Sequence, residues 1–163
     1  MKTTSTIKQE VKVSAKIRRK DGTTEDLGQI NSKPKLIMGT VFTDTGKAQV
    51  VKAVNGDTYT APTHVGWQTG SGDASESDTA LDTEASEARE VGTASIVQTN
   101  VAGDTRRVVA TLTVAGADKT ITGIGLFDAL TGGNLFLIES FPGLALKVGD
   151  SVEFTIDQVL SQA

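Results

Sequence analysis

The segment GSGDASESDTALDTEASEARE, from Gly70 to Glu90, concentrates the side chains of this sequence that could bind a cation. It holds seven carboxylates and one arginine, and Leu81 is its only large apolar side chain. If Asp73 is position one of a calcium-binding loop, oxygen-bearing side chains fall at positions three, five, seven and twelve: Ser75, Ser77, Thr79 and Glu84. However, position six is Asp78 where such a loop needs glycine, and hydroxyls replace carboxylates at positions three and five. We therefore predict a solvated acidic loop and expect no bound metal and no cofactor.

His64 is the only histidine and the chain has no cysteine, so a His-dependent catalytic site would have to include His64. Paired carboxylates could also catalyse glycoside hydrolysis, but the aromatic residues that sugar-binding clefts usually need are scarce. His64 lies beside Trp67 in THVGW. A hydrolytic site would also need a nucleophile and an orienting acid, and no G-x-S-x-G motif is present. Phosphate-binding, dinucleotide-binding and zinc-protease motifs are absent as well. We therefore predict a protein that is not an enzyme, with His64 in a packing or interface role.

Two arginines, Arg106 and Arg107, open an expected strand and allow two interpretations. They could clamp a carboxylate of a neighbouring protein, because guanidinium groups bind carboxylates through paired hydrogen bonds. They could also be a solubilising strand end, which is the favoured interpretation because exposed ion pairs contribute little.

The charge of the chain is unevenly distributed. Residues 1–36 hold nine basic and four acidic side chains, whereas the remainder holds seven basic and sixteen acidic ones. Such asymmetry is typical of a tail or arm that contacts an oppositely charged partner. Nucleic acid is not expected to be that partner, because the basic end has no aromatic side chain and the acidic body would repel phosphate. A membrane is not expected either, since no apolar run is long enough to span one.

Alternating apolar and polar residues predict strands along most of the sequence. In VKVSAKIRRK, from Val11 to Lys20, every second side chain is apolar, as in a half-buried strand. Further strands are predicted in 35–43, 63–70, 92–99, 106–115, 119–129, 134–141 and 151–160, with extended structure also over Lys47 to Val54. The pair Asn55-Gly56 predicts a hairpin turn after that last segment. Many short strands at this spacing predict an all-β fold: an antiparallel, jelly-roll-like β-sandwich.

We expect two parts: an extended basic N-terminal arm with the first strand over residues 1–36, and a sandwich body over residues 37–163. Within the body, residues 70–91 form either a short helix, with Leu81, Ala85 and Ala88 on one face, or a draped loop with Leu81 as its anchor. Trp67 is expected to be largely buried. The predicted core comprises Val109, Leu112, Val114, Ile121, Ile124, Leu126, Phe127, Phe136, Ile138, Val152, Phe154 and Ile156.

Three segments carry a resemblance to a known class of protein. They are GWQTGSGD, then SDTALDTE from Ser77 to Glu84, and finally TITGIGLFDALTGGNLFL from Thr120 to Leu137, followed by a V-G-D turn and a last strand. In this order the segments resemble small β-rich structural proteins of tailed-bacteriophage virions. The resemblance runs from about Val65 to the C-terminus.

The resemblance implies a structural role in the virion. The main hypothesis is a capsid decoration, or cement, protein that is made in the host cytoplasm, binds the major capsid protein on the outer capsid surface and stabilises the head. The alternatives are a tail, neck or fibre component, or a receptor- or carbohydrate-binding sandwich, although aromatic residues are scarce for sugar binding. A second copy of the chain, in a homodimer or homotrimer, is a further expected partner. Candidate partner-binding residues are Lys2, Lys8, Lys12, Lys16, Arg18, Arg19, Asp73, Glu76, Asp78, Leu81, Arg106 and Arg107.

Overall fold

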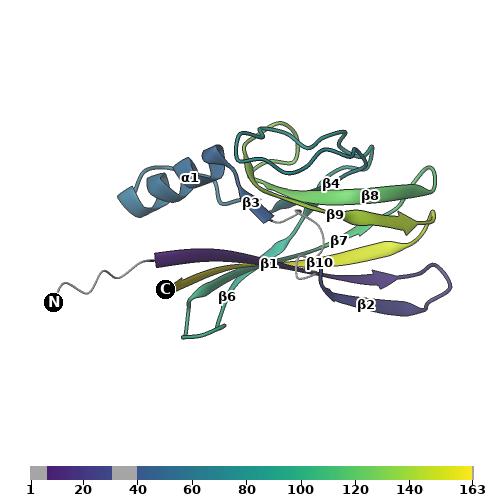
Figure 1. The fold of residues 1–163 in the computed structure, drawn as a ribbon, viewed down its shortest axis with the longest axis horizontal. Helices are drawn as coiled ribbons and strands as arrows, with labels where there is room; N and C mark the ends of the chain where they lie inside the picture. Colours follow the sequence, from purple (N-terminus) through teal and green to yellow (C-terminus); the bar gives the residue numbers. More distant parts are fainter. Residues whose placement is uncertain (1–6, 31–39, 163) are drawn as a thin grey trace.

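The computed structural model, which describes residues 7–30 and 40–162, is a sandwich of two antiparallel five-stranded sheets (Figure 1). One sheet, sheet A, has the strand order β2-β1-β10-β7-β6, and the other, sheet B, has the order β3-β9-β8-β4-β5. The strands of sheet A are β1 (Ile7–Arg18), β2 (Thr24–Gln29), β6 (Thr93–Val97), β7 (Thr105–Thr113) and β10 (Ser151–Gln162). Those of sheet B are β3 (Thr40–Phe42), β4 (His64–Gln68), β5 (Glu90–Val91), β8 (Lys119–Phe127) and β9 (Leu135–Leu146). The predicted all-β sandwich is confirmed.

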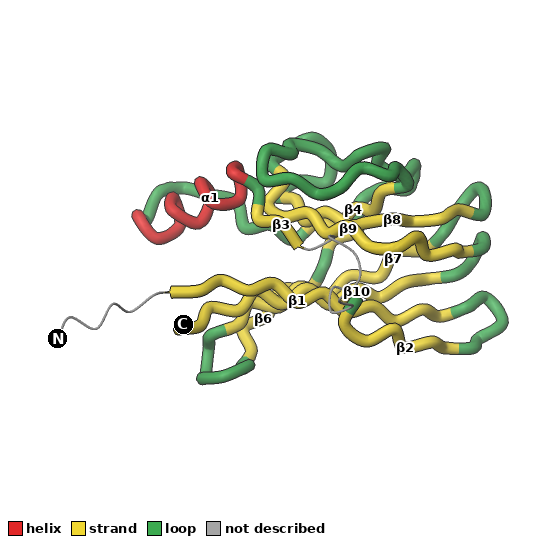
Figure 2. Tube along the Cα trace, viewed as in Figure 1, coloured by secondary structure: helices red, strands yellow, loops and turns green. Residues whose placement is uncertain are grey.

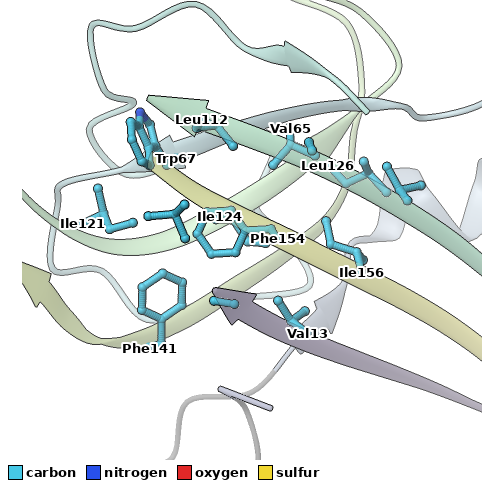
Figure 3. Packing of buried hydrophobic residues seen from close by; sticks show 14 of the residues in the cluster. Val13, Val65, Trp67, Leu112, Ile121, Ile124, Leu126, Phe141, Phe154 and Ile156 are labelled. Carbon is cyan, nitrogen blue, oxygen red and sulfur yellow. The ribbon is translucent and has the colours of Figure 1, made fainter. Parts of the chain in front are cut away.

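Apolar side chains from the inner faces of both sheets form the main core (Figure 3). Trp67 and Ile124 from sheet B and Phe154 and Ile156 from sheet A are at most 1% exposed. All but one of the residues predicted for the core are buried. The exception is Val109, which is half-buried, whereas its neighbour Val108 is fully buried. The prediction for Val109 is wrong because the inward positions of β7 are the even-numbered ones, as in Val108 and Leu112.

The basic segment near the N-terminus is part of sheet A. Strand β1 pairs with β10 along its whole length and with β2 on its other side. Its inward side chains Val13, Ala15 and Ile17 are buried, as their alternation predicts. Residues 1–6 and 31–36 of the expected arm lie outside the described residues, as do residues 35–39 of the strand predicted over 35–43.

The prediction of extended structure over Lys47 to Val54 is wrong, because these residues belong to helix α1 (Asp44–Asn55). Thr43 caps its first turn, accepting a hydrogen bond from the backbone N–H of Gly46 at 2.9 Å. Gly56 ends the helix in the left-handed conformation, with φ of 79°, and its N–H donates to the carbonyl of Ala53. The Asn55-Gly56 pair therefore terminates a helix instead of turning a hairpin.

Helix α1 is fastened to strand β9 at one end of the sandwich (Figure 1). The hydroxyl of Thr43 donates to the carbonyl of Leu135 at 2.5 Å. A Cβ on Gly46 would lie 2.0 Å from the carbonyl oxygen of Phe136, so only glycine permits this approach. No helix among the described residues is long and apolar enough to cross a membrane.

The acidic segment is a loop without helix that lies over sheet B (Figure 2). Leu81 anchors it, packing with Phe127, Leu135 and Ile138 in a second, smaller core on the outer side of that sheet. Of the two alternatives for residues 70–91, the draped loop is therefore the one observed.

Candidate functional site

The acidic loop is held in place by its own polar groups. The carboxylate of Asp82 accepts from the backbone N–H of Gly72 at 2.7 Å, and the backbone N–H of Asp82 donates to the side chain of Gln68 at 3.1 Å. Glu84 forms an isolated β-bridge with Gln68. One carboxylate of the loop, that of Asp82, therefore has a structural role, and backbone contacts with Gln68 hold the same part of the loop.

Arg89 ties the end of this loop to sheet B. Its guanidinium forms two hydrogen bonds with Glu84, of 2.6 and 2.9 Å, and lies over the ring of Phe127. It also donates to the carbonyls of Ala129 and Gly132. The side chain of Arg89 is 8% exposed, so this pair is a structural clasp of the loop.

The acidic residues predicted to bind a partner are placed separately along the loop. Glu76 forms an ion pair with Lys47 of α1, and Asp78 accepts from the backbone N–H of Ser75 at 2.8 Å. Asp73 is exposed, whereas Leu81 is buried. In residues 7–30 and 40–162, no three side chains of the metal-ligating types gather into a potential ion site.

The predicted basic residues of β1 lie on the outer face of sheet A, away from the acidic loop. Lys12 lies directly across from Asp157, and Lys16 lies across from both Glu153 and Asp26. Neighbouring strands therefore place carboxylates beside the basic residues of β1, and part of the charge asymmetry of the sequence is balanced within the sheet. The exposed side chains of Lys8 and Arg18 lie on the same face, and Lys2 is outside the described residues.

Arg19 lies at the end of the sandwich opposite α1. It forms hydrogen bonds with Asp150 and Glu25, and Asp150 also accepts from the backbone N–H groups of Lys147 and Lys20. The backbone N–H groups of Lys147 and Lys20, followed by the Arg19 guanidinium, lower the pKa of Asp150 to about 2. These bonds join the β1–β2 and β9–β10 turns beside a hollow of about 1190 Å³, and they make Arg19 a structural residue.

The two adjacent arginines of β7 have different surroundings. Arg107 forms two hydrogen bonds of 2.7 Å with Asp157 across the strand pair on the outer face. Arg106 points the other way, into a groove between α1 and the inner face of sheet A, where it contacts the carbonyl of Pro62 and the side chain of Gln158. The structure therefore separates the two members of the predicted clamp.

Glu139 is a buried acid that the sequence analysis did not identify. Its Cα partner on β8 is Ile124, so it lies on the inner face of sheet B, and it is fully buried. Burial raises the pKa of Glu139 to about 8. Thr40 donates to one carboxyl oxygen, and the other has no hydrogen-bond partner among the described residues.

His64 lies half-buried in β4, with the hydroxyl of Thr63 at 3.5 Å from its Nδ1. The structure thus places the Arg89–Glu84 pair, the cross-strand charge pairs and the groove beside α1 on different faces of the sandwich.

The comparison with known proteins identifies a family. The family model described as podophage GP4 fiber I protein gp80 matches residues 41–162, from β3 to the end of β10. No curated protein and no solved structure matches the chain. Because the match covers most of the sequence, the chain belongs to the Gp80 family of podophage fiber I proteins and is a structural protein of the phage virion.

Proposed function

We propose that this protein is a structural subunit of a fibre of the phage particle and that it acts by binding other proteins, without catalysis. The family match over residues 41–162 carries the proposal, because the matched family is described as a fiber protein. It favours the fibre alternative over capsid decoration with the major capsid protein as partner.

Strand β6 is the surface best suited to contact between copies of this subunit. It is an edge of sheet A, and residues 92–101, GTASIVQTNV, contain no charge and no proline. Exposed edge strands normally carry charges or irregularities that prevent pairing with another chain. The other edge, β2, has both: Glu25 and Asp26, and a register shift opposite β1. We therefore propose that β6 pairs with a strand of a second copy in the fibre.

Localisation and copy number in purified particles test the fibre proposal. Gold labelling of a tagged chain is expected at fibres, and quantitative mass spectrometry is expected to give far fewer copies than the major capsid protein. Uniform labelling of the head, with copies in a simple ratio to the major capsid protein, would instead establish shell decoration. Absence from purified particles would contradict both assignments.

A further inference from the structure

The groove between α1 and sheet A, named here the α1 groove, has a volume of about 360 Å³ and an apolar rim. Val54 of α1 is 84% exposed, Ile96 of β6 is 68% exposed, and Leu160 of β10 is 55% exposed. Tyr59, 43% exposed, also lines it. In Figure 1 this is the end of the sandwich where α1 projects beyond sheet B, above the ends of β1 and β10. Large apolar side chains gathered around a groove mark a surface that another molecule covers.

Arg106 lies inside this groove as a cation without a carboxylate partner among the described residues. Among the described residues, every other arginine that is buried or half-buried has a carboxylate partner. Arg19 binds Asp150, Arg89 binds Glu84 and Arg107 binds Asp157. Arg106 donates instead to two neutral acceptors, the carbonyl of Pro62 and Oε1 of Gln158. Burial lowers the pKa of Arg106 from its ordinary value, the direction expected for a cation removed from water without an opposite charge.

Gln158 adds a second unsatisfied donor beside Arg106. The residue is 7% exposed, and its Oε1 accepts from Arg106. Its Nε2 has no hydrogen-bond partner among the described residues, although a buried donor is normally paired. The one acid that lines the groove, Asp104, is already occupied, since it accepts from the backbone N–H groups of Thr99, Asn100 and Val101. The groove therefore holds a cation and an unpaired amide donor beside each other, and its one acid is already used by backbone N–H groups.

We propose that the α1 groove binds a segment of another protein of the particle, one that carries an Asp or Glu side chain flanked by aliphatic residues. The carboxylate would accept from the Arg106 guanidinium and from Nε2 of Gln158, and the flanking aliphatic side chains would cover Val54, Ile96 and Leu160. Hydrogen bonds to charged groups are stronger than neutral ones, and the apolar rim excludes water from them. This inference rests on the proposed function, because it names the chemistry of one partner of the same structural subunit.

Photo-crosslinking in assembled particles tests the proposal. A photoreactive phenylalanine analogue replaces Val54 at the rim, and a matched control replaces Val148, which is 37% exposed in the β9–β10 turn at the other end of the sandwich. We expect crosslinks from position 54, identified by peptide sequencing, on a segment of another particle protein with an acid next to aliphatic residues. Arg106→Gln in the same background is expected to lower the crosslink yield at least about tenfold, since a charged hydrogen bond contributes about 1.5–3 kcal/mol.

Arg107→Gln is the matched variant, because it removes the adjacent guanidinium from the outer face, and it is expected to leave the yield unchanged. Crosslinks to a second copy of the chain, to a segment without an acid, or to no protein at all would overturn the proposal. An unchanged yield with Arg106→Gln would overturn it as well. If that variant fails to fold, Gln158→Leu provides the second perturbation, with a lower yield expected and an unchanged yield again contradicting the proposal. The amount of the protein in the same particles tests its virion role separately.

Discussion

Arg89 donates two hydrogen bonds to the carboxylate of Glu84, and its guanidinium carbon lies 3.4 Å from the centroid of the Phe127 ring. Glu84 and Arg89 belong to the last part of the acidic loop, and Phe127 belongs to the sheet below it. The contact therefore closes the loop and fixes it to β8 at the same time.

Replacing Arg89 is expected to release the acidic loop while the sandwich stays folded. Arg89→Gln removes both bonds to Glu84 and the cation over Phe127, at an expected cost of about 2–3 kcal/mol in the free energy of unfolding. Hydrogen exchange followed by mass spectrometry should show faster exchange in residues 70–90 and little change in β7 or β10. Arg107→Gln, which removes an equally paired but more exposed arginine, should leave the loop protected. Equal exchange of residues 70–90 in the two variants would show that Arg89 does not hold the acidic loop on sheet B.

The buried carboxyl of Glu139 predicts a stability that decreases as the pH rises. Its pKa is raised from its ordinary value of 4.5 to about 8, so the folded state holds a proton that the unfolded state loses between these two values. The stabilisation is fully present below the lower value and is lost as the pH approaches the upper one. Between about pH 5 and about pH 9, the free energy of unfolding measured in urea should therefore fall by about 3–5 kcal/mol because of this group.

Glu139→Gln is the test of this assignment, because it keeps the shape and removes the ionisation. The variant should lose most of the decrease between about pH 5 and about pH 9 and should be more stable than the parent at the upper end. Glu153→Gln, at an exposed position on the outer face of sheet A, is the control and should retain the decrease. A decrease that persists unchanged in Glu139→Gln would assign the pH dependence to other groups.

The three inner strands of sheet A, β1, β7 and β10, could be predicted from the sequence because alternation is local and each of them has one buried and one more solvated face. Strand β1 illustrates this, with Val13 and Ile17 buried and Lys16 and Arg18 exposed. Strand β9 does not, since every residue from Leu135 to Phe141 is buried. The acidic loop covers the outer face of that part of sheet B, so alternation does not distinguish the two faces, and the inward position of Glu139 was not evident.

Helix α1 and the groove beside it could not be predicted in the same way. Residues 44–55 have a weak apolar stripe, and two of their valines, Val51 and Val54, remain exposed, so the periodic signal of a packed helix is faint. The cap by Thr43 and the left-handed Gly56 define the helix, and both also fit a turn. Because the groove depends on where α1 lies, the positions of Arg106 and Gln158 within it required the three-dimensional structure.

The adjacent valines of β7 provide a test of the strand's orientation. Val108 is fully buried between the sheets, whereas Val109 is half-buried on the other face. Val108→Ala should lower the free energy of unfolding by about 2–3 kcal/mol, because it removes two buried carbon atoms and leaves a cavity. Val109→Ala should cost less than about 1 kcal/mol. Urea unfolding of the two variants measures the difference, and equal or reversed costs would contradict the assignment of the inner face.

Strand β6 should control self-association of the purified protein, if it pairs with a strand of a second copy. Ser95→Lys places a charge on this edge without changing the inner face, because Ser95 is exposed and lies across from Arg107 on the outer face. Charges on an edge strand oppose pairing with another chain, so the dissociation constant measured by analytical ultracentrifugation should rise about tenfold or more. Thr111→Lys is the control, since it adds the same charge to an exposed outer-face position of β7, a strand that lies inside sheet A between β6 and β10. A parent protein that stays monomeric at high concentration, or an equal effect of the two lysines, would rule out β6 as the contact between copies.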